Sequence, residues 1–284
     1  MRQEPRGAGH RWLEVEVARN GAPPAPGQFV QILLGASSSA AFLPRPMSVA
    51  SCRAAARGLV LGFLYEPVGV GTHALAALAP GAAVEVLGPL GRGFPLETPG
   101  TPVLVAGGRG VAPMLFAAER LARARRRCLF VFGARDRSRL VGLPEARRLL
   151  AKLGGRLHLA TDDGSLGWRG DVVTLLDHVA GGEAGAGTRA SEWVIHACGP
   201  HAMLAAVARW ALARHRPAHL AMESIMACGT GVCRGCPLPR SARAKAAFDP
   251  GATPSLWGNR EWAMCCTEGP VFAAAALDWE HVEA

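Results

Sequence analysis

The chain has 284 residues, half of them hydrophobic, and carries a formal net charge of +9. The length suggests two or three domains, and no apolar run approaches the roughly 18–20 residues of a membrane-spanning helix. The charge does not indicate nucleic-acid binding, because arginines are spread along the whole chain and the densest basic run, Arg120 to Arg127, contains no aromatic residues for base stacking.

The N-terminal segment, Met1 to Arg11, is polar and lacks the apolar stretch of a secretory signal. We therefore expect a cytoplasmic protein that neither binds nucleic acid nor enters a membrane. Five of the eight cysteines crowd the last quarter of the chain. In a cytoplasmic protein such crowding favours metal ligation over disulfide bonds.

Residues 1–98 read as short strands interrupted by proline and glycine, which predicts a small antiparallel β-barrel. The expected strands are Trp12–Val17, Gln28–Leu34, Leu59–Tyr65 and Val84–Leu87, with a short helix at Thr72–Leu78.

Residues 99–222 alternate between buried strands and helices, which predicts a doubly wound parallel sheet. The expected strands are Pro102–Val105, Cys128–Phe132, Leu157–Ala160 and Trp193–Ala197; the expected helices are Met114–Arg125, Pro144–Leu153, Asp171–Val179 and Ala202–Arg214. A flexible loop is expected at Gly181–Thr188, and residues 223–284 read as a loop-rich, cysteine-bearing domain.

Three of the clustered cysteines, Cys228, Cys233 and Cys236, have the C-x4-C-x2-C spacing of plant-type [2Fe–2S] proteins. Gly229, Gly231 and Gly235 lie between or beside them, and glycine permits the positive φ angles and close backbone approach that such a loop needs. A tetrahedral zinc site is the main alternative, although zinc sites are usually built from C-x2-C pairs. A set of buried structural thiols is a further alternative.

Two short motifs in the first region are typical of flavin binding. Arg45-Pro46-Met47-Ser48 offers a guanidinium for a pyrophosphate and a hydroxyl for a flavin ring nitrogen. Gly69-Val70-Gly71-Thr72 leads into the short helix, where free backbone amides bind phosphate oxygens. Taken alone, the second motif is also consistent with an ordinary turn in which Thr72 caps the helix.

Two motifs in the second region indicate nicotinamide nucleotide binding. The glycine-rich turn from Ala106 to Pro113, with Gly107, Gly108 and Gly110, follows a buried strand and opens a helix. Cys198-Gly199-Pro200 ends a later strand of the same expected sheet. Both motifs therefore fall at the carboxyl edge of the sheet, where open α/β folds bind dinucleotides. A lone buried thiol with no role is the alternative for Cys198.

The sequence does not distinguish NADH from NADPH. Gly133 to Asp136 ends the second strand, where the adenosine ribose is expected, and Arg135, Arg137 and Arg139 would attract a 2′-phosphate. Asp162 and Asp163 would repel one.

In this order the motifs resemble the electron-transfer subunit of class 1B dihydroorotate dehydrogenase, within the ferredoxin–NADP reductase superfamily. The resemblance extends from about Leu13 to Phe272. Besides the motifs above, it rests on Leu87 to Gly91, Thr161 to Ser165, Met222-Glu223, Ala227 to Gly229 and Gly269 to Phe272.

The resemblance implies an FAD-binding barrel (1–98), an NAD-binding domain (99–222) and a [2Fe–2S] domain (223–284). It adds Tyr65 and Glu223 to the cofactor-binding residues and makes Cys266 the fourth cluster ligand, with two residues between it and Gly269. Cys265 then takes an ordinary apolar position, and if the segment is extended its side chain points away from that of Cys266.

The resemblance also implies a partner, the FMN-containing catalytic subunit that interconverts dihydroorotate and orotate, in a heterotetramer with two copies of each subunit. Hydride would pass between nicotinamide and FAD, and single electrons would pass through the cluster to the partner. The chain alone offers no evident base for oxidising dihydroorotate.

Two departures from the family pattern are visible. Arg109 replaces a small or aliphatic residue, and an insertion, Pro239 to Trp262, separates Cys236 from the last cysteines. Because of these departures, an alternative function stays open. The chain would then be an NAD(P)H-dependent reductase with the same domains whose electron acceptor is a hydrogenase, a ferredoxin or a glutamate-synthase-like protein. A zinc-binding or nucleotide-sensing regulatory protein is the alternative without electron transfer.

Overall fold

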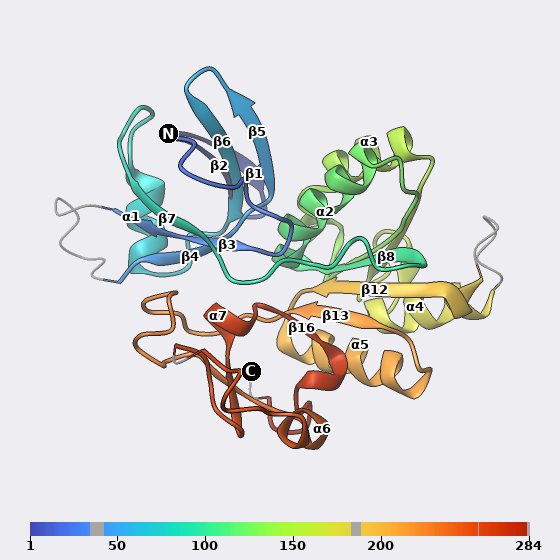
Figure 1. The fold of residues 1–284 in the computed structure, drawn as a ribbon. Helices are drawn as coiled ribbons and strands as arrows, with labels where there is room; N and C mark the ends of the chain where they lie inside the picture. The colour runs from blue at the N-terminus through green and yellow to red at the C-terminus, as the bar shows by residue number, and fades with distance from the viewer. Residues whose placement is uncertain (35–42, 183–188, 255, 283–284) are drawn as a thin grey trace.

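The computed structural model describes residues 1–34, 43–182, 189–254 and 256–282. Figure 1 shows the N-terminal strands in blue and cyan, a central sheet flanked by helices in green and yellow, and a loop-rich C-terminal segment in orange and red. The C-terminal segment lies against both other parts, which agrees with its contacts with them described below.

The N-terminal strands form two antiparallel sheets, as the alternating sequence predicts. The four-stranded sheet has the order β1-β2-β6-β5, and the three-stranded sheet has the order β4-β3-β7. Their bounds are β1 Arg2–Gly7, β2 His10–Val17, β3 Phe29–Leu33, β4 Arg45–Ser48, β5 Ser51–Ala55, β6 Gly58–Tyr65 and β7 Glu85–Leu90, with helix α1 at Val70–Ala77. Leu13, Ile32 and Phe63 are fully buried in the core of this part.

The central sheet has seven strands in the order β11-β10-β9-β8-β12-β13-β16. All pairs are parallel except β13 with β16, so the predicted doubly wound parallel sheet is confirmed. The strands are β8 Thr101–Gly107, β9 Leu129–Ala134, β10 Arg156–Thr161, β11 Trp168–Arg169, β12 Trp193–Cys198 and β13 Ala218–Ala221.

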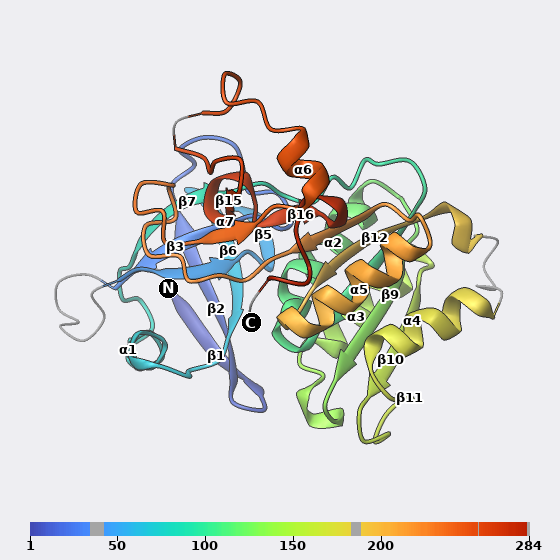
Figure 2. The same ribbon diagram turned by 90° about the horizontal axis from the view of Figure 1, so that it is seen from below.

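Helices cover both faces of this sheet (Figures 1 and 2). Helices α2 (Val111–Arg123) and α3 (Leu143–Leu153) bury their apolar side chains in one core, and α4 (Val172–Gly181) and α5 (His201–Ala213) bury theirs in another. Short 3-10 helices occur at Gly108–Gly110, Arg137–Arg139, Ala190–Glu192 and Ala274–Ala276.

The C-terminal segment contributes one strand to the central sheet and one small hairpin. Strand β16 (Val271–Ala273) pairs with β13, and β14 (Pro237–Pro239) pairs with β15 (Trp262–Met264). The insertion after Pro239 is therefore the connection of this hairpin, and it carries helix α6 (Ala242–Ala246). Helix α7 (Cys265–Glu268) follows β15 directly.

Several local predictions were wrong. The strands β1, β4, β5 and β13 were not predicted, and the Arg45–Ser48 motif itself forms β4. Cys265 and Cys266 begin a short helix instead of lying in extended chain. Of the expected loop, Gly181 ends α4, and residues 183–188 lie outside the described residues. None of the helices in the described ranges is long and apolar enough to cross a membrane.

Candidate functional site

The cysteine cluster is formed by a loop that follows β13 and by the first turn of α7. Cys233 is exposed and Cys228 partly exposed, whereas Cys236 and Cys266 are buried. All eight cysteines are free thiols. Exposed and buried thiols together are suited to a group that is held inside the protein and is accessible from outside.

Backbone amides point at the sulfurs of this loop. The N–H groups of Thr230 and Cys233 both donate to the Sγ atom of Cys228 at 3.4 Å, and that of Gly235 donates to Cys233 at the same distance. Burial opposes ionisation of Cys228, but these amide donors outweigh it and lower the pKa of its thiol to about 6. The loop therefore favours the thiolate form, which is the form that binds metal.

The two adjacent cysteines of α7 point in different directions. The Cys266 amide donates to the Cys236 sulfur at 3.4 Å, and the nearby Cys236 thiol, together with burial, raises the pKa of the Cys266 thiol. The Cys265 sulfur instead lies 3.8 Å from the carbonyl oxygen of Met222, and burial raises the pKa of its thiol. Cys266, and not Cys265, therefore faces the other clustered thiols, although through a helical turn rather than the expected extended chain.

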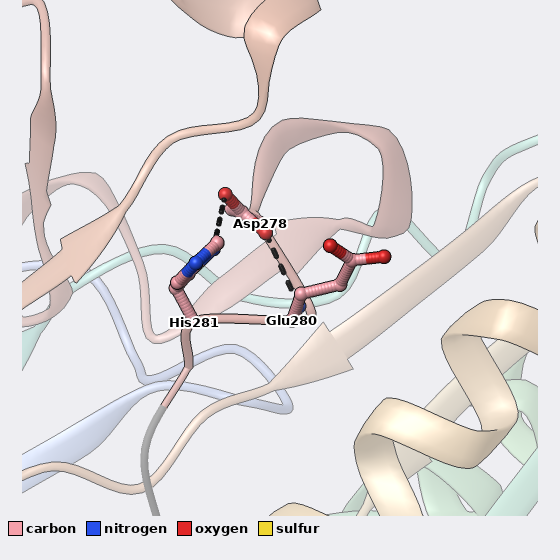
Figure 3. A group of neighbouring side chains, drawn as sticks. All are labelled: Asp278, Glu280 and His281. Carbon is pink, nitrogen blue, oxygen red and sulfur yellow. Dashed lines mark hydrogen bonds and ion pairs between the residues drawn. The ribbon is translucent and has the colours of Figure 1, made fainter.

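The spacing of the thiols tests the zinc alternative. Ligands of a tetrahedral zinc ion lie about 3.8 Å apart, since Zn–S bonds are about 2.3 Å long. Among the described residues, no three cysteine sulfurs lie within 4.8 Å of one another; that condition is met only by the exposed group Asp278, Glu280 and His281 (Figure 3). The cysteines are thus spread more widely than the ligands of a single tetrahedral ion.

Two glycines of the cysteine loop have positive φ angles, as predicted: Gly229 at 75° and Gly231 at 87°. A Cβ on Gly231 would lie 2.4 Å from the carbonyl oxygen of Leu256, so the loop packs tightly against the insertion. The prediction was wrong for Gly235, whose φ is not positive; the left-handed residue there is Arg234, at 54°.

The flavin motifs meet in space. A Cβ on Gly71 would lie 2.7–2.8 Å from the guanidinium and Cδ of Arg45, so the arginine covers the first turn of α1. The Arg45 Nε atom donates to the carbonyl of Leu43 at 3.2 Å. Pro46 and Ser48 are exposed on the same short strand, and Met47 is buried. A guanidinium beside a helix N-terminus is a typical phosphate-binding arrangement.

Two residues near this arrangement have other contacts. Thr72 is not the cap residue; Gly69 is, and the Thr72 Oγ1 atom accepts hydrogen bonds from the amides of Val68 (2.9 Å) and Gly69 (3.1 Å). Tyr65 is buried, and its hydroxyl donates to Gln3 at 2.7 Å. Any contact of Tyr65 with a flavin is therefore left to its main chain.

The nicotinamide motifs also meet, because β8 and β12 are neighbouring parallel strands. A Cβ on Gly110 would lie 2.1 Å from the Cys198 carbonyl oxygen, and one on Gly199 would lie 3.1 Å from the Cα atom of Gly107. Pro200 caps α5 directly after this contact. The two turns thus form one surface at the carboxyl edge of the sheet.

Glu223 follows β13, whereas the residues of the expected ribose site follow β9 and β10, on the other side of β8 and β12 in the sheet. The Glu223 carbonyl is 2.5 Å from His201 Nε2, at the start of α5. Burial, followed by the nearby charge of Glu223, raises the pKa of the Cys198 thiol to about 12. At the ends of β9 and β10, the Arg137 amide donates to Ser165 at 2.8 Å.

Comparison with known proteins gives the family. The model of the oxidoreductase NAD-binding domain matches residues 104–209. The chain is 32% identical to the dihydroorotate dehydrogenase B (NAD(+)) electron transfer subunit of Desulforamulus reducens and 33% identical to that of Bacillus caldolyticus, over 90% and 89% of this chain and 87% and 86% of those proteins. The chain belongs to this family of electron transfer subunits. It is an oxidoreductase component with an NAD-binding domain.

The fold comparison agrees with the family assignment. A solved structure described as an NADH-dependent reduced ferredoxin-NADP oxidoreductase, studied for flavin-based electron bifurcation, covers 99% of this chain with a TM-score of 0.77 and 24% identity. The match covers 89% of that structure. It shows the ferredoxin reductase-like fold of the subunit, with its antiparallel N-terminal sheets and its parallel nucleotide-binding sheet.

The sequence analysis missed Gln31, which joins the flavin motif to the cysteine loop of this subunit. Gln31 lies in β3 opposite Pro46 and is fully buried. Its Nε2 atom donates to the Met226 carbonyl at 2.9 Å, and Gly229 packs against its side chain. A lone amide in the otherwise apolar strand Phe29–Leu33 was the signal that could have identified it.

The sequence analysis also missed a buried ion pair that fixes α7. Glu268 pairs with Arg240 of the insertion and accepts hydrogen bonds from the amides of Gly258 (2.9 Å) and Met264 (2.8 Å). Both side chains are nearly buried, at 9% and 12% exposure. The insertion is therefore tied to the helix that carries Cys266.

Proposed function

We propose that this subunit passes electrons between NAD(H) and a dihydroorotate dehydrogenase catalytic subunit. Residues 1–98 would bind FAD on a small barrel, residues 99–222 would bind NAD(H), and residues 223–284 would hold a [2Fe–2S] cluster. The supporting observation is the direct contact between the flavin strands and the cysteine loop, through Gln31 with Met226 and Gly229.

In this proposal, the residues around α1 bind the flavin nucleotide. Arg45 and the amides of Gly71 and Thr72 would hold the pyrophosphate, because the guanidinium already covers that helix turn. Ser48, exposed at the end of β4, would hydrogen-bond the ring system, with Pro46, Met47 and the Tyr65 main chain beside it.

The contact between the β8 and β12 turns supports the nicotinamide site. Gly107, Gly110 and Gly199 would keep the two turns packed together, and Gly108 would face the ligand. Cys198 would lie against the nicotinamide as a neutral thiol, because its pKa of about 12 keeps it protonated near neutral pH. Pro200 and Glu223 would complete this edge.

Cys228, Cys233, Cys236 and Cys266 are the proposed cluster ligands. The wide spacing of the thiols in the described residues supports a two-iron cluster over a single zinc ion, and the amide donors to three of these sulfurs suit metal-bound thiolates in general. The same amides would stabilise negative charge on the sulfurs.

When bound, the nicotinamide exchanges a hydride, the flavin converts it into single electrons, and the iron–sulfur cluster relays these one at a time. The contribution of the chain is to bind and orient these groups. The motifs of this chain contain no candidate base for the oxidation of dihydroorotate, so we assign that oxidation to the partner.

The proposed partner is the FMN-containing catalytic subunit, in an assembly with two copies of each. Large apolar side chains are exposed around the cysteines, among them Ile225 at 83% and Val232 at 70%. Exposed apolar groups of this size commonly mark protein interfaces. The free thiols are consistent with the expected cytoplasmic location.

Cofactor analysis of protein purified without oxygen tests this proposal. We expect FAD and roughly two irons per chain, as a [2Fe–2S] cluster requires. Stoichiometric zinc without iron would contradict electron transfer and favour the regulatory alternative. Copurification of a ferredoxin or hydrogenase, with no affinity for the dihydroorotate-oxidising subunit, would overturn only the choice of partner.

A further inference from the structure

The glycine-rich turn after β8 has one open face. Gly107 and Gly110 are buried against Met203 and Cys198, so a side chain at either position would collide. Gly108, in contrast, has a φ of +50°, and apart from its chain neighbours no atom of the described residues lies within 4 Å of the place where a Cβ would stand. Of the three glycines, only Gly108 has a free approach to its backbone, and the next residue, Arg109, is exposed.

Arg109 reaches across to the flavin-binding part of the chain. Its Nη1 atom lies 3.4 Å from Oε2 of Glu66, which directly follows strand β6. The Arg109 side chain is 46% exposed and that of Glu66 24%. The same carboxylate oxygen lies 4.0 Å from Nε2 of His10. The guanidinium of the residue next to the open face is therefore held by a carboxylate that also lies near a second basic side chain.

We propose that Arg109 binds the pyrophosphate of the nicotinamide dinucleotide and that Glu66 competes with this ligand for the guanidinium. The inference rests on the nucleotide site proposed above and identifies the residue there that recognises the anion. Exposed ion pairs contribute little to stability, so the Arg109–Glu66 pair can open at small cost. Arginine binds phosphate oxygens with two parallel hydrogen bonds, which a single carboxylate contact at 3.4 Å does not match.

The competition predicts opposite effects for two single variants. The probe is ADP-ribose, which has the pyrophosphate but no nicotinamide ring, titrated into the FAD-loaded protein by calorimetry. Arg109→Ala should raise the Kd by about tenfold, as expected for one lost charge-assisted contact. Glu66→Gln should lower the Kd several-fold, because the guanidinium is released to the ligand. Arg109→Lys should fall between wild type and Arg109→Ala. Arg53→Ala, an exposed arginine of β5 paired with Glu14, is the matched control and should not change the Kd.

A different pattern of Kd changes is expected if the Arg109–Glu66 ion pair has only a structural role. If the ion pair only holds the two parts together, Glu66→Gln and Arg109→Ala should weaken ADP-ribose binding alike, and that result would overturn the proposal. An unchanged Kd in Arg109→Ala would also overturn it. If the wild-type protein fails to bind ADP-ribose, the nucleotide site itself is wrong, and this result differs from both others.

Discussion

The nucleotide-binding edge and the cysteine region are built in different ways. At the nucleotide edge, Gly110 meets Cys198 because β8 and β12 are parallel neighbours, so their carboxyl ends coincide wherever the sheet forms. In the cysteine region, the short hairpin β14–β15 places Cys236 beside Cys265, whose amide donates to the Cys236 carbonyl at 2.9 Å, but no strand carries Cys228 or Cys233 among the described residues. Cys228 and Cys266 belong to a loop and a four-residue helix that depend on side chains from elsewhere.

This difference determines where each region is vulnerable. The nucleotide edge depends on backbone topology, so most single side chains there affect ligand binding and leave the fold intact. The cysteine region depends on specific contacts, chiefly those of Gln31 and Glu268. Substitutions in the second region should therefore affect the cluster from a distance.

The largest expected effect is loss of the cluster in Cys266→Ser, because an alkoxide is a poorer iron ligand than a thiolate. Cys265→Ser is the matched control and should keep the iron at a modest packing cost, since its sulfur contacts the Met222 carbonyl instead of the other thiols. Iron content and visible spectra give the readout. Loss of iron in Cys265→Ser alone would show that the assignment along α7 is off by one residue.

The second largest effect, on stability and iron retention, is expected from Glu268→Gln, which leaves the nearly buried Arg240 without its countercharge. Breaking a buried ion pair costs roughly 3–5 kcal/mol. We expect a lower denaturation midpoint and faster release of iron. Glu261→Gln is the control, because it breaks the exposed pair with Lys245 and should cost at most about 1 kcal/mol. Equal effects of the two variants would show that the insertion does not brace α7.

At the flavin motif, Arg45→Ala should weaken FAD retention by about 1.5–3 kcal/mol, the size of one charge-assisted hydrogen bond. The fold should be unaffected, because the contacts of the guanidinium within the described residues are with the first turn of α1 and the Leu43 carbonyl. Flavin fluorescence after gel filtration measures retention, with Arg53→Ala as control. Full FAD occupancy in Arg45→Ala would contradict the assigned role.

A smaller, pH-dependent effect is expected at His196 in the central sheet. Burial, with smaller effects of His219 and Arg126, lowers its pKa from 6.5 to about 3, so the folded protein holds it neutral. As the pH falls, His196 is therefore protonated in the unfolded chain at a higher pH than in the folded protein. The contribution of His196 to the free energy of unfolding is therefore fully present above pH 6.5. It falls as the pH drops and is lower by about 2 kcal/mol at pH 5.

His196→Leu should flatten the dependence of the unfolding midpoint on pH between 7 and 5. His215→Asn, at an exposed position, should leave this slope unchanged. An unaltered slope in His196→Leu would show that His196 is not the group that titrates.

The sequence predicted the nucleotide edge well because its signals are local. A buried strand followed by glycines specifies both the turn and its place in the sheet, so Gly107, Gly110 and Cys198 could be brought together before the fold was known. The pattern was less informative for short edge strands such as β1 and β5, whose residues are largely exposed and do not alternate clearly.

The contacts that position the cysteines could not be predicted in the same way. Gln31 and Met226 are separated by 195 residues, and Arg240 and Glu268 by 28. No local pattern links such pairs. The four-residue helix at Cys265 was mistaken for extended chain because the Glu268 carboxylate, which accepts the Met264 amide, is held by the distant Arg240 and Gly258.

The central claim is that electrons pass between NAD(H) and the cysteine cluster through this chain, and on to a dihydroorotate-oxidising partner. Anaerobic reduction followed by visible and electron paramagnetic resonance spectroscopy tests it most directly. NADH should reduce the iron–sulfur centre of the isolated chain, whereas dihydroorotate should reduce it only after the catalytic subunit is added. A centre that stays oxidised with NADH, or is reduced by dihydroorotate in the isolated chain, would contradict the account.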